Sequence, residues 1–147
     1  QGKNYKVVNG GVSGSTTASG ISRLKWFLKL KPTVLVLALG ANDGLRGIKL
    51  TETEKNLKKI ISMAQKAKIK VILAGMRIPT NYGKAYTKKF KTMYPKLAKE
   101  FKTGLIPFLL KDVAGNPKLN LEDAIHPNKE GYKVVAKNVM AILKDYL

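Results

Sequence analysis

Cysteine is absent from this 147-residue chain, and histidine occurs only once. The lack of cysteine excludes disulfide bonds, thiol catalysis and cysteine-ligated zinc. One histidine and a few scattered acidic residues are also too few ligands to predict a metal site. No apolar run reaches the roughly 18 residues that a membrane-spanning helix needs. The longest run, Thr33–Ala41, has the length of a buried strand.

Acidic residues are scarce: nine face 28 basic ones, and the formal net charge is +19. Such a charge could serve a nucleic acid, an anionic membrane surface or acidic substrates. Arginine, which reads nucleic-acid bases with its planar fork, occurs only at Arg23, Arg46 and Arg77. The lysines between residues 58 and 102 alternate with apolar positions at helical spacing, which favours solvated helix faces over a nucleic-acid interface.

Helical apolar spacing alternates along the chain with short continuous apolar runs of strand length. Continuous runs indicate strands buried on both faces of a parallel sheet, so we predict one α/β domain over residues 1–147 with a doubly wound sheet. The predicted strands are Tyr5–Asn9, Thr33–Gly40, Lys70–Gly75 and Gly104–Leu109, and the predicted helices are Thr16–Leu30, Thr51–Lys68, Tyr86–Phe101 and Lys129–Tyr146, the last capped by Asn128.

The unusual residues follow these strands. "GGVSGS", "GAND", "MRIPTNYG" and "DAIHP" each come after one predicted strand. Ligands bind outside the carboxyl ends of the strands in open parallel sheets. Four separate loops would therefore meet at one crevice, which indicates an active site.

The single histidine, His126, lies three residues after Asp123 in the last of these loops. The carboxylate is close enough to bond one ring nitrogen, which leaves the other free as a general base. The alternative is a histidine with a structural role.

Two other loops contain hydrogen-bond donors. The Asn42 amide in "GAND" could donate to a developing oxyanion, and Gly14 in "VSGST" could place a backbone N–H against an anion. Each could also belong to an ordinary turn, since asparagine and glycine are common there.

Together the blocks resemble the SGNH hydrolase superfamily, the lipases and esterases with a Gly-Asp-Ser-Leu signature, and most of all its bacterial thioesterase I/protease I/lysophospholipase L1 type. The resemblance is carried by "GANDGLRG", "RIPTNYG", "YPKLAKEF" and "DAIHPN", and it covers nearly the whole chain. It implies a three-layer α/β/α sandwich with a five-stranded parallel sheet, a hydrolase that needs no cofactor, and a periplasmic or secreted location.

The resemblance also implies residue roles. Asp123 and His126 match the orienting acid and the general base, while Gly14 and Asn42 match the two oxyanion donors. The residues that would line the acyl pocket are Gly44, Leu45, Ile78, Pro79 and Tyr82.

The nucleophile block of this superfamily has no match, because Gly-Asp-Ser does not occur in the 147 residues. We expect a companion segment, cleaved or encoded apart, to supply the first strand and the serine, because a parallel sheet without a central strand would expose unpaired edges. Two alternatives are a fragment that lacks its beginning and the recruitment of Ser13 or Ser15. "GVSGS" does not fit the Gly-x-Ser-x-Gly elbow, because residue 15 is serine.

The sequence therefore predicts a serine hydrolase of acyl esters or thioesters, completed by a separate serine-bearing segment. The alternative function is a catalytically inactive SGNH-like module that binds anionic lipid or polymer through its lysines. Nucleic-acid binding is a third hypothesis, and it depends on charge alone.

Overall fold

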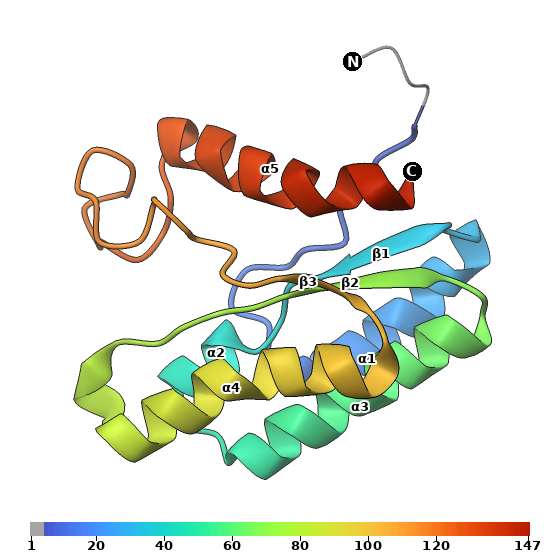
Figure 1. Ribbon diagram of the computed structural model, residues 1–147, viewed down its shortest axis with the longest axis horizontal. Helices are drawn as coiled ribbons and strands as arrows, with labels where there is room; N and C mark the ends of the chain where they lie inside the picture. The colour runs from blue at the N-terminus through green and yellow to red at the C-terminus, as the bar shows by residue number, and fades with distance from the viewer. Residues whose placement is uncertain (1–4) are drawn as a thin grey trace.

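The computed structural model describes residues 5–147 and places a three-stranded parallel sheet between two layers of helices (Figure 1). The strand order is β1-β2-β3, with Val36 opposite Ile72 and Ile72 opposite Gly104. The strands are β1 (Val34–Leu37), β2 (Lys70–Ala74) and β3 (Gly104–Ile106). The helices are α1 (Thr17–Phe27), α2 (Ala41–Leu45), α3 (Leu50–Lys66), α4 (Lys84–Phe101) and α5 (Lys129–Leu143), with short 3-10 turns η1 (Leu28–Leu30), η2 (Thr80–Tyr82) and η3 (Lys144–Tyr146).

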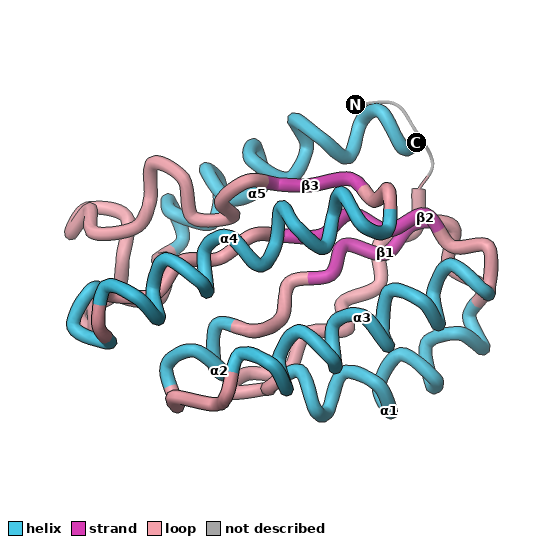
Figure 2. Tube along the Cα trace, turned by 60° about the horizontal axis from the view of Figure 1, so that its bottom comes forward, coloured by secondary structure: helices cyan, strands magenta, loops and turns pink. Residues whose placement is uncertain are grey.

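Alternate residues of the central strand point to opposite helix layers. Val71 and Leu73 belong to the core shared with α1, α3 and α4, whereas Ile72 and Ala74 belong to the core beneath α5. Figure 2 shows α5 on the side of the sheet opposite α1 and α3. A continuous apolar strand is what this arrangement requires, since both of its faces are covered.

The larger core depends on the apolar stripe of α3. Leu57, Ile60, Ile61 and Ala64 recur at the spacing of one helix face, and all four are fully or almost fully buried. Burial of a leucine or isoleucine side chain contributes about 1.5–3 kcal/mol. The lysines of α3 lie on the remaining faces and are partly or fully exposed, as the sequence predicts for solvated helices.

The described sheet has three strands, fewer than the four that the residue pattern predicts and the five that the resemblance implies. The prediction of a strand at Tyr5–Asn9 is wrong: within residues 5–147 this segment has no regular secondary structure and pairs with no strand, and all five of its residues are exposed. A strand forms only where a neighbouring strand can pair with its backbone N–H and C=O groups. Within residues 5–147, the outer edge of β1 carries no ladder partner.

The "GAND" segment is a short helix, α2, where the sequence predicts only a loop. Gly40 makes the turn from β1 into this helix with φ of +110°, a conformation that glycine adopts without strain. The buried Tyr94 hydroxyl supports the turn and donates a 3.1 Å hydrogen bond to the Leu39 carbonyl. Burial raises the pKa of Tyr94, so the hydroxyl keeps its proton.

No helix in the described part of the chain combines the length and apolar character needed to cross a membrane.

Candidate active site

Asp123 and His126 form a hydrogen-bonded pair in the loop before α5. Asp123 Oδ2 lies 2.7 Å from His126 Nδ1, and Asp123 Oδ1 accepts hydrogen bonds of 2.9 Å from the backbone N–H groups of Ile125 and His126. The carboxylate thereby selects the tautomer with the proton on Nδ1. Nε2 is then left as the acceptor that a general base needs.

The loop around the pair is fixed at both ends. The Leu121 N–H donates a 2.8 Å hydrogen bond to the His126 carbonyl, and Asn120 and Pro127 form an isolated antiparallel β-bridge. Asn128 accepts from the N–H groups of Glu130 and Gly131, which confirms it as the cap of α5. The histidine therefore sits on a loop held by backbone bonds and a helix cap.

Hydrogen bonding lowers the pKa of Asp123 to about 2, first through the backbone N–H of His126 and then through its ring and the Ile125 N–H. We expect a carboxyl titration followed by NMR to give a midpoint near 2 for this residue. Because the folded pKa lies below the unfolded value, the bonding stabilises the loop above about pH 3.9 and its contribution disappears as the pH falls through 2.

The variant His126→Gln serves as the control for this titration. It removes the ring bond but keeps the backbone donors, so the midpoint should rise and still remain below about 3.9. A wild-type midpoint at the ordinary aspartate value would contradict the bonding described.

The two expected oxyanion residues occupy adjoining segments. Gly14 has φ of +71°, and the Asn42 side-chain nitrogen donates 3.0 Å to the carbonyl of Ser15. Arg46 donates 2.9 Å to the carbonyl of Gly14. The second N–H of the Asn42 amide forms no hydrogen bond among the described residues, so it is free to donate elsewhere.

Four of the five expected pocket residues lie in contact as two pairs. A Cβ at Gly44 would stand 2.7 Å from Ile78 Cγ2, and the Tyr82 hydroxyl donates 2.8 Å to the Leu45 carbonyl. Pro79, the fifth, is exposed and leads into η2. The segment before α4 therefore packs against α2.

The loops that carry these residues lie at the carboxyl ends of the strands. In Figure 1, α2, the segment before α4 and the loop before α5 all lie toward the left, where β1 and β2 point. No hydrogen bond within residues 5–147 joins the His126 ring to the Gly14–Asn42 group, nor to any serine hydroxyl. The His126 side chain is 63% exposed.

Sequence reasoning assigned no role to Asp43 or Arg46, although both stand in the quoted "GANDGLRG" block. Their partners lie 26 and 32 residues away in the chain, at Thr17 and Gly14. The one signal in the sequence that could have singled them out is the scarcity of acidic residues and of arginine.

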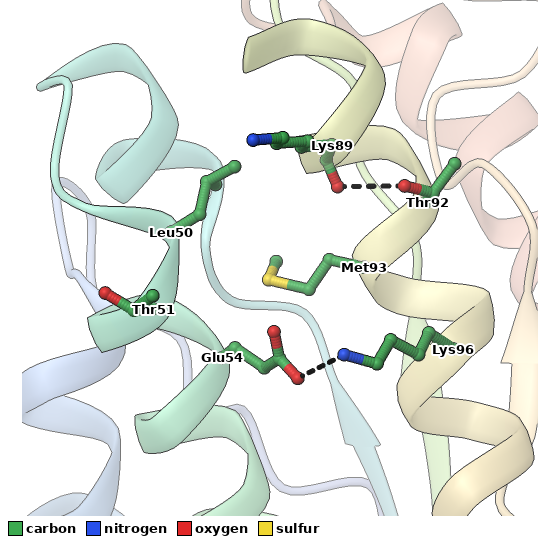
Figure 3. Close-up of a pocket in the computed structure, with 7 residues that line it drawn as sticks. All are labelled: Leu50, Thr51, Glu54, Lys89, Thr92, Met93 and Lys96. Atoms are coloured by element: carbon green, nitrogen blue, oxygen red, sulfur yellow. Dashed lines mark hydrogen bonds and ion pairs between the residues drawn. The ribbon is translucent and has the colours of Figure 1, made fainter. Parts of the chain in front are cut away.

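A shallow groove of about 280 Å³ lies elsewhere, between α3 and α4 (Figure 3). Two of its lining residues, Glu54 and Lys96, form an ion pair at 3.0 Å, and the hydrogen bond from Lys96 lowers the pKa of Glu54. Glu54 also pairs with Lys58, which does not line the groove, at 3.3 Å. None of the expected site residues lines this groove. Its lining residues are Leu50, Thr51, Glu54, Lys89, Thr92, Met93 and Lys96.

Within residues 5–147, no three histidine or acidic side chains gather as ligands for a metal ion.

The fold, a parallel sheet between two layers of helices, is the α/β/α architecture of solved esterases of the SGNH-hydrolase class. Residues 1–134 match the sequence pattern of the GDSL-like lipase/acylhydrolase family, and the chain belongs to this family.

Three relatives illustrate the similarity. The chain is 40% identical over 131 residues to thioesterase 1/protease 1/lysophospholipase L1 of Escherichia coli, a match covering 88% of this chain and 63% of that protein. It is 40% identical over 151 residues to the esterase TesA of Pseudomonas aeruginosa, covering 100% of this chain and 74% of that protein. A crystal structure of TesA superimposes with a TM-score of 0.94 at 37% identity, over 99% of this chain and 82% of that one. The chain thus spans less than two thirds of the length of the Escherichia coli relative.

Proposed function

We propose that this chain supplies the base and the oxyanion donors of a serine hydrolase that cleaves acyl esters or thioesters. The observation that carries the proposal is the 2.7 Å contact between His126 Nδ1 and Asp123 Oδ2, which leaves Nε2 free at the carboxyl end of the sheet. Relatives named as a thioesterase, a lysophospholipase and an esterase support this class of substrate.

The reaction would proceed in two acyl transfers. A serine hydroxyl attacks the carbonyl carbon while His126 Nε2 takes its proton, and the resulting oxyanion receives N–H groups from Gly14 and Asn42. Collapse releases the alcohol or thiol, which takes the proton from His126. Water then attacks the acyl-serine by the same route and releases the acid.

The serine itself comes, in this proposal, from a companion segment with Gly-Asp-Ser that pairs with the outer edge of β1. A strand parallel to β1 would bring its carboxyl end to the same edge of the sheet as His126. Such a segment could cover apolar side chains that are exposed in this chain, at Tyr5, Val7, Val8 and Val12. Val7 has the largest exposed fraction of the four, 90%. The exposed ring of His126 agrees with a site that still lacks one neighbour.

A test uses the 147-residue chain alone and together with a segment containing Gly-Asp-Ser-Leu. We expect p-nitrophenyl ester hydrolysis only from the combination, and a fluorophosphonate probe should label the serine of the segment. The matched control is the same segment with that serine replaced by alanine. Labelling of Ser13 or Ser15 would overturn the companion hypothesis, and an inactive combination would overturn the proposed hydrolysis.

The alternative of an inactive module for anionic lipid or polymer gains less support. Binding of anionic lipid or polymer through lysines requires positive charge, but it does not require an aspartate that fixes the tautomer of a histidine. Retention on anionic vesicles that disappears at high salt, without hydrolysis by the combination, would favour this alternative.

A further inference from the structure

We propose that Asp43 is a positioning residue that sets the spacing of the two oxyanion donors, Gly14 and Asn42. This inference depends on the proposed function for its catalytic meaning. The hydrogen bonds that support it are features of the 147-residue chain by itself.

Asp43 is a buried acid with an unusual set of partners. Asp43 is only 1% exposed, and within residues 5–147 no basic group pairs with its carboxylate. Oδ2 accepts 2.9 Å from the backbone N–H of Thr17, and Oδ1 accepts from the hydroxyl groups of Thr17 at 2.5 Å and Thr53 at 3.3 Å. A buried carboxyl group is tolerated when its oxygens are satisfied in this way.

The bonds of Asp43 are one of three sets of hydrogen bonds, here called ties, that join residues 14–17 to residues 42–46. Arg46 holds the carbonyl of Gly14, Asn42 holds the carbonyl of Ser15, and Asp43 holds both the N–H and the hydroxyl of Thr17. Of the three anchoring side chains, only that of Asp43 is in a buried residue. Water competes least for its bonds, so this tie is the one that fixes the distance between the segments.

The position of the tie explains why it bears on catalysis. Asp43 directly follows Asn42, and Thr17 comes three residues after Gly14. A shift of the Thr17 anchor would move Gly14 relative to the Asn42 amide. Oxyanion donors act only when they lie within about 2.7–3.1 Å of the developing charge, so a small displacement weakens both.

A purely structural role for Asp43 is the competing explanation. Thr16, the cap residue of α1, makes no side-chain cap bond, and Asp43 satisfies the N–H of Thr17 in its place. Loss of a helix cap lowers stability but leaves the turnover of the folded enzyme unchanged. The two roles therefore differ in kinetics.

The kinetic test uses Asp43→Asn, which keeps the shape of the side chain, in the chain combined with its serine-bearing segment. We expect kcat to fall on the order of a hundredfold with KM changed less than about threefold, the pattern of a lost transition-state interaction. A boronic acid that mimics the tetrahedral intermediate should lose affinity by a similar factor. Thr17→Val, which removes the hydroxyl and keeps the backbone bond, should give a smaller loss of kcat, and Thr17→Ser should restore it.

Glu54→Gln is the matched control, because it breaks the ion pairs with Lys58 and Lys96 away from these segments. It should leave kcat and the boronic acid affinity unchanged. If Asp43→Asn lowers only the melting temperature, with kcat and that affinity within twofold of wild type, the positioning role is overturned.

A second measurement separates this inference from the proposed function. In the 147-residue chain alone, NMR should show one Asn42 side-chain proton protected from exchange by its bond to the Ser15 carbonyl. Asp43→Asn, or Thr17→Val if the first variant fails to fold, should remove that protection, whereas Glu54→Gln should not. If the protection persists, the positioning role fails even where hydrolysis is observed; if it disappears while the wild-type combination is inactive, the proposed hydrolysis fails and the tie remains.

Discussion

Replacing His126 with alanine should lower kcat for p-nitrophenyl esters by at least about a thousandfold in the chain combined with the proposed serine-bearing segment. General-base assistance contributes about 10²–10⁴ in rate, and removal of a histidine that acts together with a serine costs still more. The fold should survive, since the ring is largely exposed and its one hydrogen bond within residues 5–147 is to Asp123. Steady-state rates and a thermal melt measured on the same preparation check both parts.

Two controls sharpen this result. Glu122→Gln changes an exposed acid of the same loop and should keep both rate and melting temperature. Added imidazole should restore part of the activity of His126→Ala, because the exposed site admits a small base. A variant that retains activity within tenfold of wild type would remove His126 from the mechanism.

Phe90→Ala should lower the free energy of unfolding by about 3–5 kcal/mol, the range for removal of a buried aromatic side chain. Phe90 is completely buried in α4, where its ring meets Tyr94 edge-to-face with centroids 5.5 Å apart. It also packs beneath α2: a Cβ on Gly44 would stand 2.8 Å from Phe90 Cε2. Urea unfolding followed by circular dichroism measures the change.

Phe108→Ala makes the same chemical change at a partly buried position, where the Arg77 guanidinium lies 4.5 Å above the ring. Its cost should be clearly smaller, because less apolar surface returns to water. Equal losses for the two variants would mean that Phe90 does not anchor α2 to the core.

Local chemistry explains the parts of the fold that the sequence predicts well. The start of α5 follows from the Asn128 cap, and β2 follows from a continuous apolar run, so both are found within a residue of their predicted bounds. Tyr5–Asn9 has an equally good strand pattern, but a strand also needs a neighbour, and the local pattern contains no information on that neighbour. The same limit explains why the sequence predicts a loop where the structure has α2.

The contacts of the candidate site also differ in whether the sequence can predict them. The contact between Asp123 and His126 could be predicted because the two residues are three positions apart in one loop, and the structure contains it. Asp43 could not be assigned a role from sequence, since its partner Thr17 lies 26 residues earlier. The catalytic roles of Gly14, Asn42, Asp123 and His126 and the pocket role of Gly44, Leu45, Ile78, Pro79 and Tyr82 remain predictions.

The acid–histidine pair is built within a loop of a few residues, by bonds that involve neither the sheet nor any other chain segment. Its preorganisation therefore precedes any encounter with a nucleophile, and the encounter need not reorient the imidazole. If a companion strand supplies the serine, as proposed, its affinity for β1 and the proton transfer by His126 are separable quantities. Substitutions along β1 should then change the fraction of molecules that assemble, while substitutions between residues 121 and 128 should change the rate of each assembled molecule.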